Sequence, residues 1–221
     1  MAESQYNLTV LISGNGSNLQ ALIDACASGA LPNTRITHVI SNRQKAFGRE
    51  RARNASIPDS YHNLVQYKKK HPQTPEGIEA ARKEYDADLA NIILASKPRP
   101  DLIVCAGWMH IVTPSFLTPI ADAGIKIINL HPALPGEFAG AGAIERAWKA
   151  GQEEGLKRTG VMIHEVIAEV DAGDAIVTKE VELRKDESLD KLETRIHGVE
   201  HGLIVEGTKK TLEGIGAARA K

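Results

Sequence analysis

Through the first two thirds of the chain, short apolar runs alternate with longer segments in which apolar residues recur every three or four positions. The short β-branched runs predict strands and the longer segments predict helices. The expected strands cover residues 7–12, 36–40, 101–106 and 125–130, and the expected helices cover residues 18–27, 46–55, 74–96, 114–121 and 143–150. This alternation indicates an α/β fold with a Rossmann-like, doubly wound, mostly parallel sheet.

The pattern changes after residue 158. Two strand-like runs, residues 159–168 and 174–183, are separated by only five residues, and a helix is expected over residues 187–212. Such closely spaced strands suit an antiparallel or mixed C-terminal extension of the sheet. The hydrophilic stretch of residues 66–72 is expected to be a surface loop.

Composition narrows the class of protein. A chain of 221 residues, 42% hydrophobic and 25% charged, suits a single domain over residues 1–221 with a sizeable core. Its net charge of −1 predicts neither a nucleic-acid partner nor a membrane surface, and no apolar run approaches the length of a membrane span. The only cysteines, Cys26 and Cys105, are expected to be buried thiols. With no signal-peptide pattern at the N-terminus, these features favour a cytoplasmic protein.

The segment INLHP at residues 128–132 offers the first candidate chemistry. In a strand, Asn129 and His131 point to the same side, and Pro132 ends the strand at the edge where open α/β sheets bind their ligands. An asparagine N–H can hold a developing oxyanion, and a neighbouring histidine can accept a proton from an attacking amine or polarise a carbonyl. The pair therefore suggests acyl transfer. The alternative is structural, with Asn129 capping a turn and His131 bonding a backbone carbonyl.

Asp171 is the best third partner, because it lies in a turn between two expected strands. A carboxylate beside His131 would favour the imidazolium and orient the ring or a water molecule. An ordinary Asx-turn is the alternative for Asp171. His164, inside an apolar strand, either supports the same site or is a satisfied core histidine.

A glycine-rich loop, SGNGSN at residues 13–18, separates the first strand from the first helix. Backbone N–H groups and the helix dipole make such a loop an anion site, so Gly16, Ser17 and Asn18 are candidates to bind a phosphate. A plain β–α turn with Asn18 as helix cap is the alternative. Leu19 replaces the third glycine of a dinucleotide fingerprint, and no Walker lysine follows, so a phosphate monoester is favoured over a dinucleotide or a triphosphate.

The order of motifs GNGSN, AFGRERA, AGWMHIVTP, NLHPALPG and EVDAGDAI resembles the phosphoribosylglycinamide formyltransferase family, and HPALPGEF followed by AIERAW is similar to its fungal members. The resemblance runs from about Leu8 to Thr211. It implies the formyltransferase fold and transfer of a formyl group from 10-formyltetrahydrofolate to glycinamide ribonucleotide, in purine (IMP) biosynthesis. It implies no metal, and a monomer or a homodimer.

The resemblance also implies further site residues. His197 would lie near the phosphate and Glu200 would contact the ribose, although both otherwise look like residues of a free helix face. The resemblance assigns the pterin pocket to Met109, His110, Ile111 and Val112 on one side and to Ile167, Ala168, Glu169 and Val170 on the other. Arg82 matches an arginine near the folate tail carboxylates, where a solvated helix arginine is the alternative. In this view the N-terminal half binds the ribonucleotide, and the C-terminal half binds folate and carries out catalysis.

One position departs from the family. Where members usually have a histidine before AIERA, this chain has Gly142, which makes the loop more flexible and removes a polar group. Three rival functions stay open. A formyltetrahydrofolate hydrolase normally carries an extra N-terminal domain, and a methionyl-tRNA formyltransferase needs a basic C-terminal domain. The third is a phosphate-binding module without catalysis. Since the chain begins at the catalytic strand and ends at Lys221, we expect a stand-alone transferase.

Overall fold

The computed structural model describes residues 5–220. These residues divide into two compact units, one ending at Ile127 and the other beginning at Ile128. The expectation of a single domain stays a prediction.

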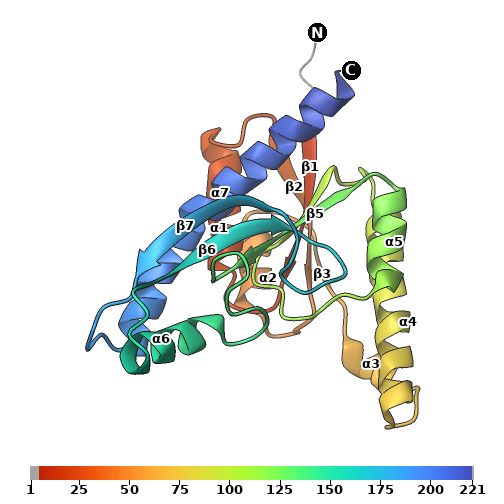
Figure 1. The fold of residues 1–221 in the computed structure, drawn as a ribbon. Helices are drawn as coiled ribbons and strands as arrows, with labels where there is room; N and C mark the ends of the chain where they lie inside the picture. The colour runs from red at the N-terminus through yellow and green to blue at the C-terminus, as the bar shows by residue number, and fades with distance from the viewer. Residues whose placement is uncertain (1–4, 221) are drawn as a thin grey trace. The chain divides into compact units, whose positions relative to one another are not determined.

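The first unit is a parallel α/β layer (Figure 1). Its strands are β1 (Tyr6–Ile12), β2 (Thr34–Ser41), β3 (Asp59–Tyr61) and β4 (Leu102–Cys105), in the spatial order β3-β2-β1-β4. All three pairings are parallel. The helices are α1 (Ser17–Ser28), α2 (Phe47–Asn54), α3 (Leu64–Lys68), α4 (Pro75–Leu94) and α5 (Pro114–Asp122). All four residues of β4 (LIVC) are apolar and buried, and the last five residues of β1 (LTVLI) are also buried, as expected for strands of a parallel sheet covered on both faces.

The second unit is antiparallel. Its strands are β5 (Lys126–His131), which starts two residues before the unit boundary, β6 (Arg158–Glu165) and β7 (Ala175–Glu182), and its helices are α6 (Ala143–Glu153) and α7 (Leu189–Arg219). β6 pairs antiparallel with both β5 and β7. The 31-residue helix α7 runs along β6 and β7 (Figure 1). It packs so closely that a Cβ on Gly207 would lie 2.7 Å from the Ile163 side chain.

The sequence-based elements are confirmed, with four differences. The closing helix, expected to end at residue 212, continues to Arg219. Residues 66–68, expected in a loop, belong to the short helix α3, which the Asn63 side chain caps by accepting a bond from the Val65 N–H (2.9 Å). The strand expected to reach residue 168 ends at Glu165, because the chain turns back there and Gly173 packs directly against the Glu165 carbonyl. β3 was not expected, since three residues are too few for a periodic signal.

The two cysteines are free thiols. Burial raises the pKa of Cys105 to about 12 and that of Cys26 to about 11, so both are poor nucleophiles. Cys26, in α1, is only half-buried, so the expectation that both would be buried is wrong for that residue. Within residues 5–220, no helix combines the length and the apolar character that a membrane crossing requires.

Candidate active site

The carboxyl end of β5 presents the amide of Asn129 and the imidazole of His131 on one side of the strand. His131 is the last residue of β5, and Pro132 follows it, as the sequence pattern predicts. The Leu130 side chain between them is buried in the core. The strand therefore fixes the spacing of the two polar groups.

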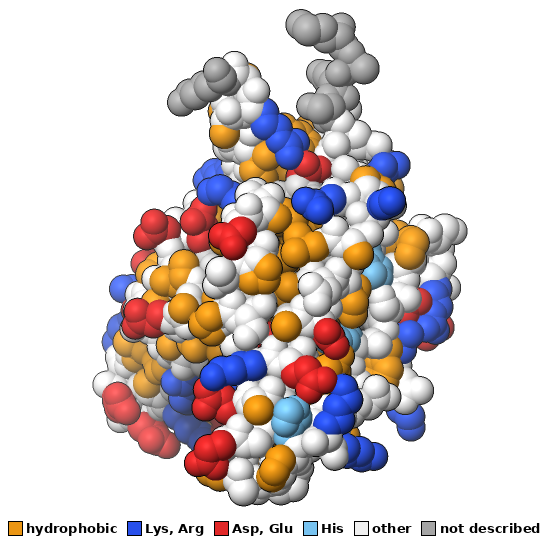
Figure 2. Space-filling view, turned by 90° about the vertical axis from the view of Figure 1, so that its right-hand side faces the viewer, with side chains coloured by type: hydrophobic (Ala, Val, Ile, Leu, Met, Phe, Trp, Pro, Cys, Tyr) orange, Lys and Arg blue, Asp and Glu red, His pale blue; other side chains and the backbone are white. Residues whose placement is uncertain are grey.

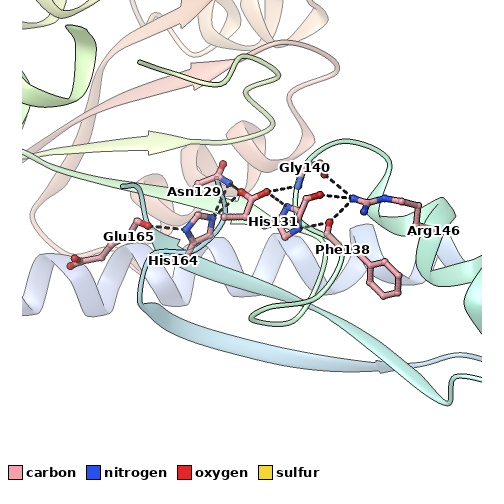
Figure 3. Close-up of polar contacts among 9 residues, drawn as sticks. Asn129, His131, Phe138, Gly140, Arg146, His164 and Glu165 are labelled. Atoms are coloured by element: carbon pink, nitrogen blue, oxygen red, sulfur yellow. Dashed lines mark hydrogen bonds and ion pairs between the residues drawn. The ribbon is translucent and has the colours of Figure 1, made fainter. Parts of the chain in front are cut away.

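β6 adds His164 to the same place. In the antiparallel ladder Asn129 lies opposite His164, which brings the two side chains face to face. The ring Nε2 of His164 lies 3.1 Å from Asn129 Nδ2, and its Nδ1 lies 2.8 Å from the Glu165 carbonyl oxygen, which accepts (Figure 3). His164 is thus a buried histidine whose ring faces the candidate site, a combination of the two alternatives drawn from the sequence.

Asp171 reaches the group from the turn between β6 and β7. Its backbone is left-handed (φ 54°), a conformation that aspartate tolerates better than most residues. One carboxylate oxygen, Oδ2, lies 3.4 Å from His131 Nδ1 and accepts a bond from the Gly140 N–H (2.8 Å). The other, Oδ1, lies 3.4 Å from both Asn129 Nδ2 and His164 Nε2. These contacts to residues far along the chain are not those of a local Asx-turn.

His131 lies between two acceptors, since its Nδ1 faces Asp171 and its Nε2 lies 3.2 Å from the Phe138 carbonyl oxygen. Burial of the ring lowers its pKa, and the opposing effects of Asp171 and Phe138 do not compensate, so the pKa stays below the ordinary 6.5. The expected effect of Asp171 is present, since its charge raises the pKa of His131, but burial outweighs it. The neutral ring is the dominant form at pH 7.

The Asp171 carboxylate is the stable charge of the cluster. Burial by itself raises its pKa, but the hydrogen bonds from His164 and from the Gly140 backbone, together with His131, outweigh burial. The pKa is therefore held below the ordinary 3.8, and the group is ionised at neutral pH.

The Asn129 amide is not free to meet a substrate in this arrangement. Its Nδ2 lies 3.1 Å from His164 Nε2 and 3.4 Å from Asp171 Oδ1, so the amide nitrogen is directed into the cluster. Its role as an oxyanion donor stays a prediction, and it requires one hydrogen to exchange its present partner for the substrate.

Arg146 is a residue of this region that the sequence did not single out. From α6, its Nη2 donates to the carbonyl oxygens of Phe138 and Ala139, both at 2.7 Å (Figure 3). It thereby holds the loop whose Phe138 carbonyl meets His131 and whose Gly140 N–H meets Asp171. The quoted AIERA motif contains this arginine, but only the fold shows what it contacts.

The glycine loop of the first unit has the features of an anion site. Gly16 is left-handed (φ 76°) and is the N-cap of α1, with no side-chain capping bond. The helix begins at Ser17, so the alternative in which Asn18 is the cap is wrong. Ser17 and Asn18 are the first two helical residues, and the positive end of the helix dipole at this point favours a bound anion.

Two residues of α2 support this loop and were missed. Gly48 crosses Gly16 so closely that a Cβ on Gly16 would lie 2.5 Å from the Gly48 Cα, and the Gly48 N–H donates to the Gly14 carbonyl (3.1 Å). Arg51 donates to the backbone and side-chain oxygens of Asn15, both at 3.0 Å. Gly48 and Arg51 belong to the quoted FGRER stretch, whose three-residue spacing places them on one helix face.

The other predicted site residues were assigned to the folate and to the ribonucleotide. In the first unit, Met109 and Ile111 expose large apolar side chains, and Arg82 donates through Nη2 to the Ile111 carbonyl oxygen (2.8 Å). In the second unit, the apolar side chains of Ile167 and Val170 are exposed in the β6–β7 turn with Ala168 and Glu169, while in α7 His197 is exposed. Glu200 is buried, so the free-helix-face alternative is wrong for it. Among residues 5–220, no group of three or more His, Cys, Asp or Glu side chains is arranged to hold a metal ion.

Comparisons with known proteins agree on the family. A family model described as formyl transferase matches residues 6–208. Phosphoribosylglycinamide formyltransferase from Schizosaccharomyces pombe is 51% identical over 90% of this chain and 94% of that protein. The protein of the same name from Saccharomyces cerevisiae is 44% identical over 93% of this chain and 97% of its own length. The predicted resemblance to fungal members is therefore confirmed.

Solved structures agree on the fold. Glycinamide ribonucleotide transformylase 1 from Symbiobacterium toebii has a TM-score of 0.80 at 33% identity, covering 95% of this chain and 89% of that one. Phosphoribosylglycinamide formyltransferase from Campylobacter jejuni has a TM-score of 0.78 at 29% identity, covering 95% and 100%. The predicted α/β formyltransferase fold is confirmed, and this chain belongs to the formyl transferase family.

Proposed function

We propose that this protein transfers the formyl group of 10-formyltetrahydrofolate to the amine of 5'-phosphoribosylglycinamide, as a step of de novo purine biosynthesis. The observation that carries the proposal is the convergence of Asn129, His131 and Asp171 on one cluster of the second unit. A binding module has no need to bury a carboxylate between two imidazoles and an amide. The relatives named phosphoribosylglycinamide formyltransferase, 44–51% identical, support the choice of substrates.

The reaction places two demands on the site. The amine nitrogen forms a bond to the formyl carbon, and the bond from that carbon to N10 of the folate breaks. The proton lost by the attacking nitrogen ends on N10, and the tetrahedral intermediate carries negative charge on the formyl oxygen. A site for this chemistry needs a group that moves a proton and a donor for the oxyanion.

His131 meets the first demand because its lowered pKa keeps the ring neutral and able to accept a proton at pH 7. The neutral ring carries one proton. With that proton on Nδ1, directed at Asp171, Nε2 has a free lone pair and makes no hydrogen bond to the Phe138 carbonyl oxygen 3.2 Å away, so it can accept the proton of the amine. Asp171 then stabilises the imidazolium that forms. Asn129 meets the second demand by turning one amide hydrogen to the oxyanion, while Asp171 organises a water molecule that relays the proton.

Binding of the two substrates is assigned to separate features. Gly16, Ser17 and Asn18 hold the ribonucleotide phosphate at the start of α1, and His197 and Glu200 of α7 serve the phosphate and the ribose. The segments 109–112 and 167–170 contact the pterin, which suits their exposed apolar side chains. The Arg82 guanidinium, which uses Nη2 on the Ile111 carbonyl, keeps further N–H groups for the folate tail carboxylates.

The setting of the enzyme is also a proposal. We infer that the protein is cytoplasmic, because both cysteines are free thiols. We also infer that it acts as a monomer or a homodimer. Figure 2 shows acidic and basic side chains interspersed over the face it draws, as the net charge of −1 suggests. Small molecules rather than nucleic acid are the partners that fit this distribution.

The test is an assay of tetrahydrofolate or dideazafolate release with and without glycinamide ribonucleotide. We expect release that requires the ribonucleotide and falls at least a hundredfold in His131→Ala, on the scale of losing a general base. His71→Ala is the matched control, since the His71 ring contacts Glu84 (Nε2 to Oε2, 2.8 Å) within the first unit. Release without the ribonucleotide would indicate a hydrolase, and an undiminished rate in His131→Ala would refute the assigned mechanism.

A further inference from the structure

Asp86 is a buried carboxylate that the proposed mechanism does not use. It lies in α4 with 0% of its surface exposed. Its Oδ1 lies 2.7 Å from His110 Nε2, and its Oδ2 accepts a bond from the Thr113 backbone N–H at 2.6 Å. Both partners belong to the segment between β4 and α5, so one side chain of α4 contacts this segment at two points.

The burial of this carboxyl group calls for a reason. Removing such a group from water is costly, and a well-packed apolar residue often stabilises a core as well as a buried pair of polar side chains does. The neighbouring core positions of α4, Ala81, Leu89 and Ala90, are apolar. A buried carboxyl group here is better explained by the conformation it specifies than by the stability it adds.

The contacted segment depends on outside anchors for its shape. Residues 109–113 form no helix or strand. The Met109 N–H donates to Ser13 Oγ (2.8 Å), and the Ile111 carbonyl accepts from Arg82 Nη2 (2.8 Å). Arg82 and Asp86 are four residues apart, on the same face of α4, so that face holds the segment at residues 110, 111 and 113.

The same anchors decide what the segment presents outward. The His110 ring is drawn inward to Asp86, and its side chain is only 8% exposed. The side chains on either side of it, Met109 and Ile111, are 66% and 53% exposed. With the His110 ring turned toward Asp86, the apolar side chains of Met109 and Ile111 form the exposed surface of the segment. That surface changes if His110 loses its contact with Asp86.

We propose that Asp86 is a positioning residue that sets the conformation of residues 109–113 and thereby the affinity for the folate co-substrate. This inference rests on the proposed function, which assigns that segment to the pterin. Asp86 acts through His110 and the Thr113 N–H and does not touch the reacting atoms. Its removal should therefore weaken folate binding selectively.

The test compares Asp86→Ala with Asp88→Ala. Asp88 lies on the same helix, and its carboxylate accepts from the Tyr67 hydroxyl (2.7 Å), away from the segment. Steady-state kinetics give KM for each substrate, and calorimetry gives Kd for tetrahydrofolate. For Asp86→Ala we expect KM and Kd for the folate to rise about tenfold, which corresponds to about 1.4 kcal/mol. The ribonucleotide KM should stay within twofold, as should every constant of Asp88→Ala.

Two further variants keep the inference testable if Asp86→Ala does not fold. Asp86→Asn retains one oxygen for the Thr113 N–H, and His110→Ala removes the other partner, so each should raise the folate constants about threefold. Unchanged folate constants in these variants, or an equal rise in both KM values, would overturn the inference alone. Wild-type protein that neither turns over nor binds tetrahydrofolate would refute the proposed function as well.

Discussion

Replacing Gly16 by alanine tests the packing of the glycine loop most directly. Two separate penalties apply at this position. The backbone is left-handed (φ 76°), which costs an L-residue about 1–2 kcal/mol. The new Cβ would also lie 2.5 Å from the Gly48 Cα, a backbone atom that cannot rotate away, and such overpacking costs about 1–3 kcal/mol. We therefore expect Gly16→Ala to lower the free energy of unfolding by about 2–5 kcal/mol.

Two other glycines of the first unit separate the penalties. Gly29, at the end of α1, is left-handed (φ 79°) but has nothing within 4 Å of an added Cβ, so Gly29→Ala should cost only about 1–2 kcal/mol. Gly14 has neither a left-handed backbone nor a neighbour within 4 Å, and we expect Gly14→Ala to change stability by less than about 0.5 kcal/mol.

The assay is urea unfolding followed by circular dichroism, with thermal unfolding as a second measure. For a chain of this size each kcal/mol corresponds to about 2–4 °C in Tm. Gly16→Ala should also raise KM for the ribonucleotide, because relief of the clash moves the loop that we assign to its phosphate. The reasoning would be refuted if Gly16→Ala were no less stable than Gly29→Ala, or if Gly14→Ala were as unstable as Gly16→Ala.

Three further predictions concern the second unit. Because burial lowers the pKa of His131, proton uptake by its ring should occur below pH 6.5, and kcat/KM should fall only below that pH. Asp171 raises the pKa of His131, so Asp171→Asn should move the titration of His131 to still lower pH. NMR of the His131 ring measures this titration without turnover. A shift of the titration to higher pH would contradict the prediction. Gly207→Ala should destabilise the protein by about 1–3 kcal/mol, because the new Cβ would clash with Ile163. Gly202→Ala, in the same helix but with open space around the new Cβ, should stabilise the protein by about 0.5–1 kcal/mol. Equal effects of the two variants in urea unfolding would disprove the assigned packing. Gly142→His should lower the free energy of unfolding by about 1 kcal/mol, because the backbone at position 142 is left-handed (φ 69°) although nothing lies within 4 Å of an added Cβ. The same variant should raise kcat. An unchanged kcat would show that the missing histidine is unimportant.

The sequence by itself determined the features that depend on neighbours along the chain. The strands and helices follow from hydrophobic periodicity, which is a local property, and nearly all of them are confirmed. The placement of Asn129 and His131 on one side of a strand that ends at Pro132 follows from the two-residue repeat of β-structure. The N-cap was not among these features, because the sequence offered Asn18 as the cap and the structure places the cap at Gly16.

Only the tertiary structure decided which distant residues meet. His164 faces Asn129 because of the register of β5 and β6, and Asp171 reaches both because of the turn that follows. Gly48 and Asp86 give no periodic signal of their roles, because each depends on a close approach between segments far apart in the sequence. The direction of the His131 pKa shift could not be derived from the sequence for the same reason. A charged neighbour can be proposed from the sequence, but the burial that outweighs it is a property of the folded chain.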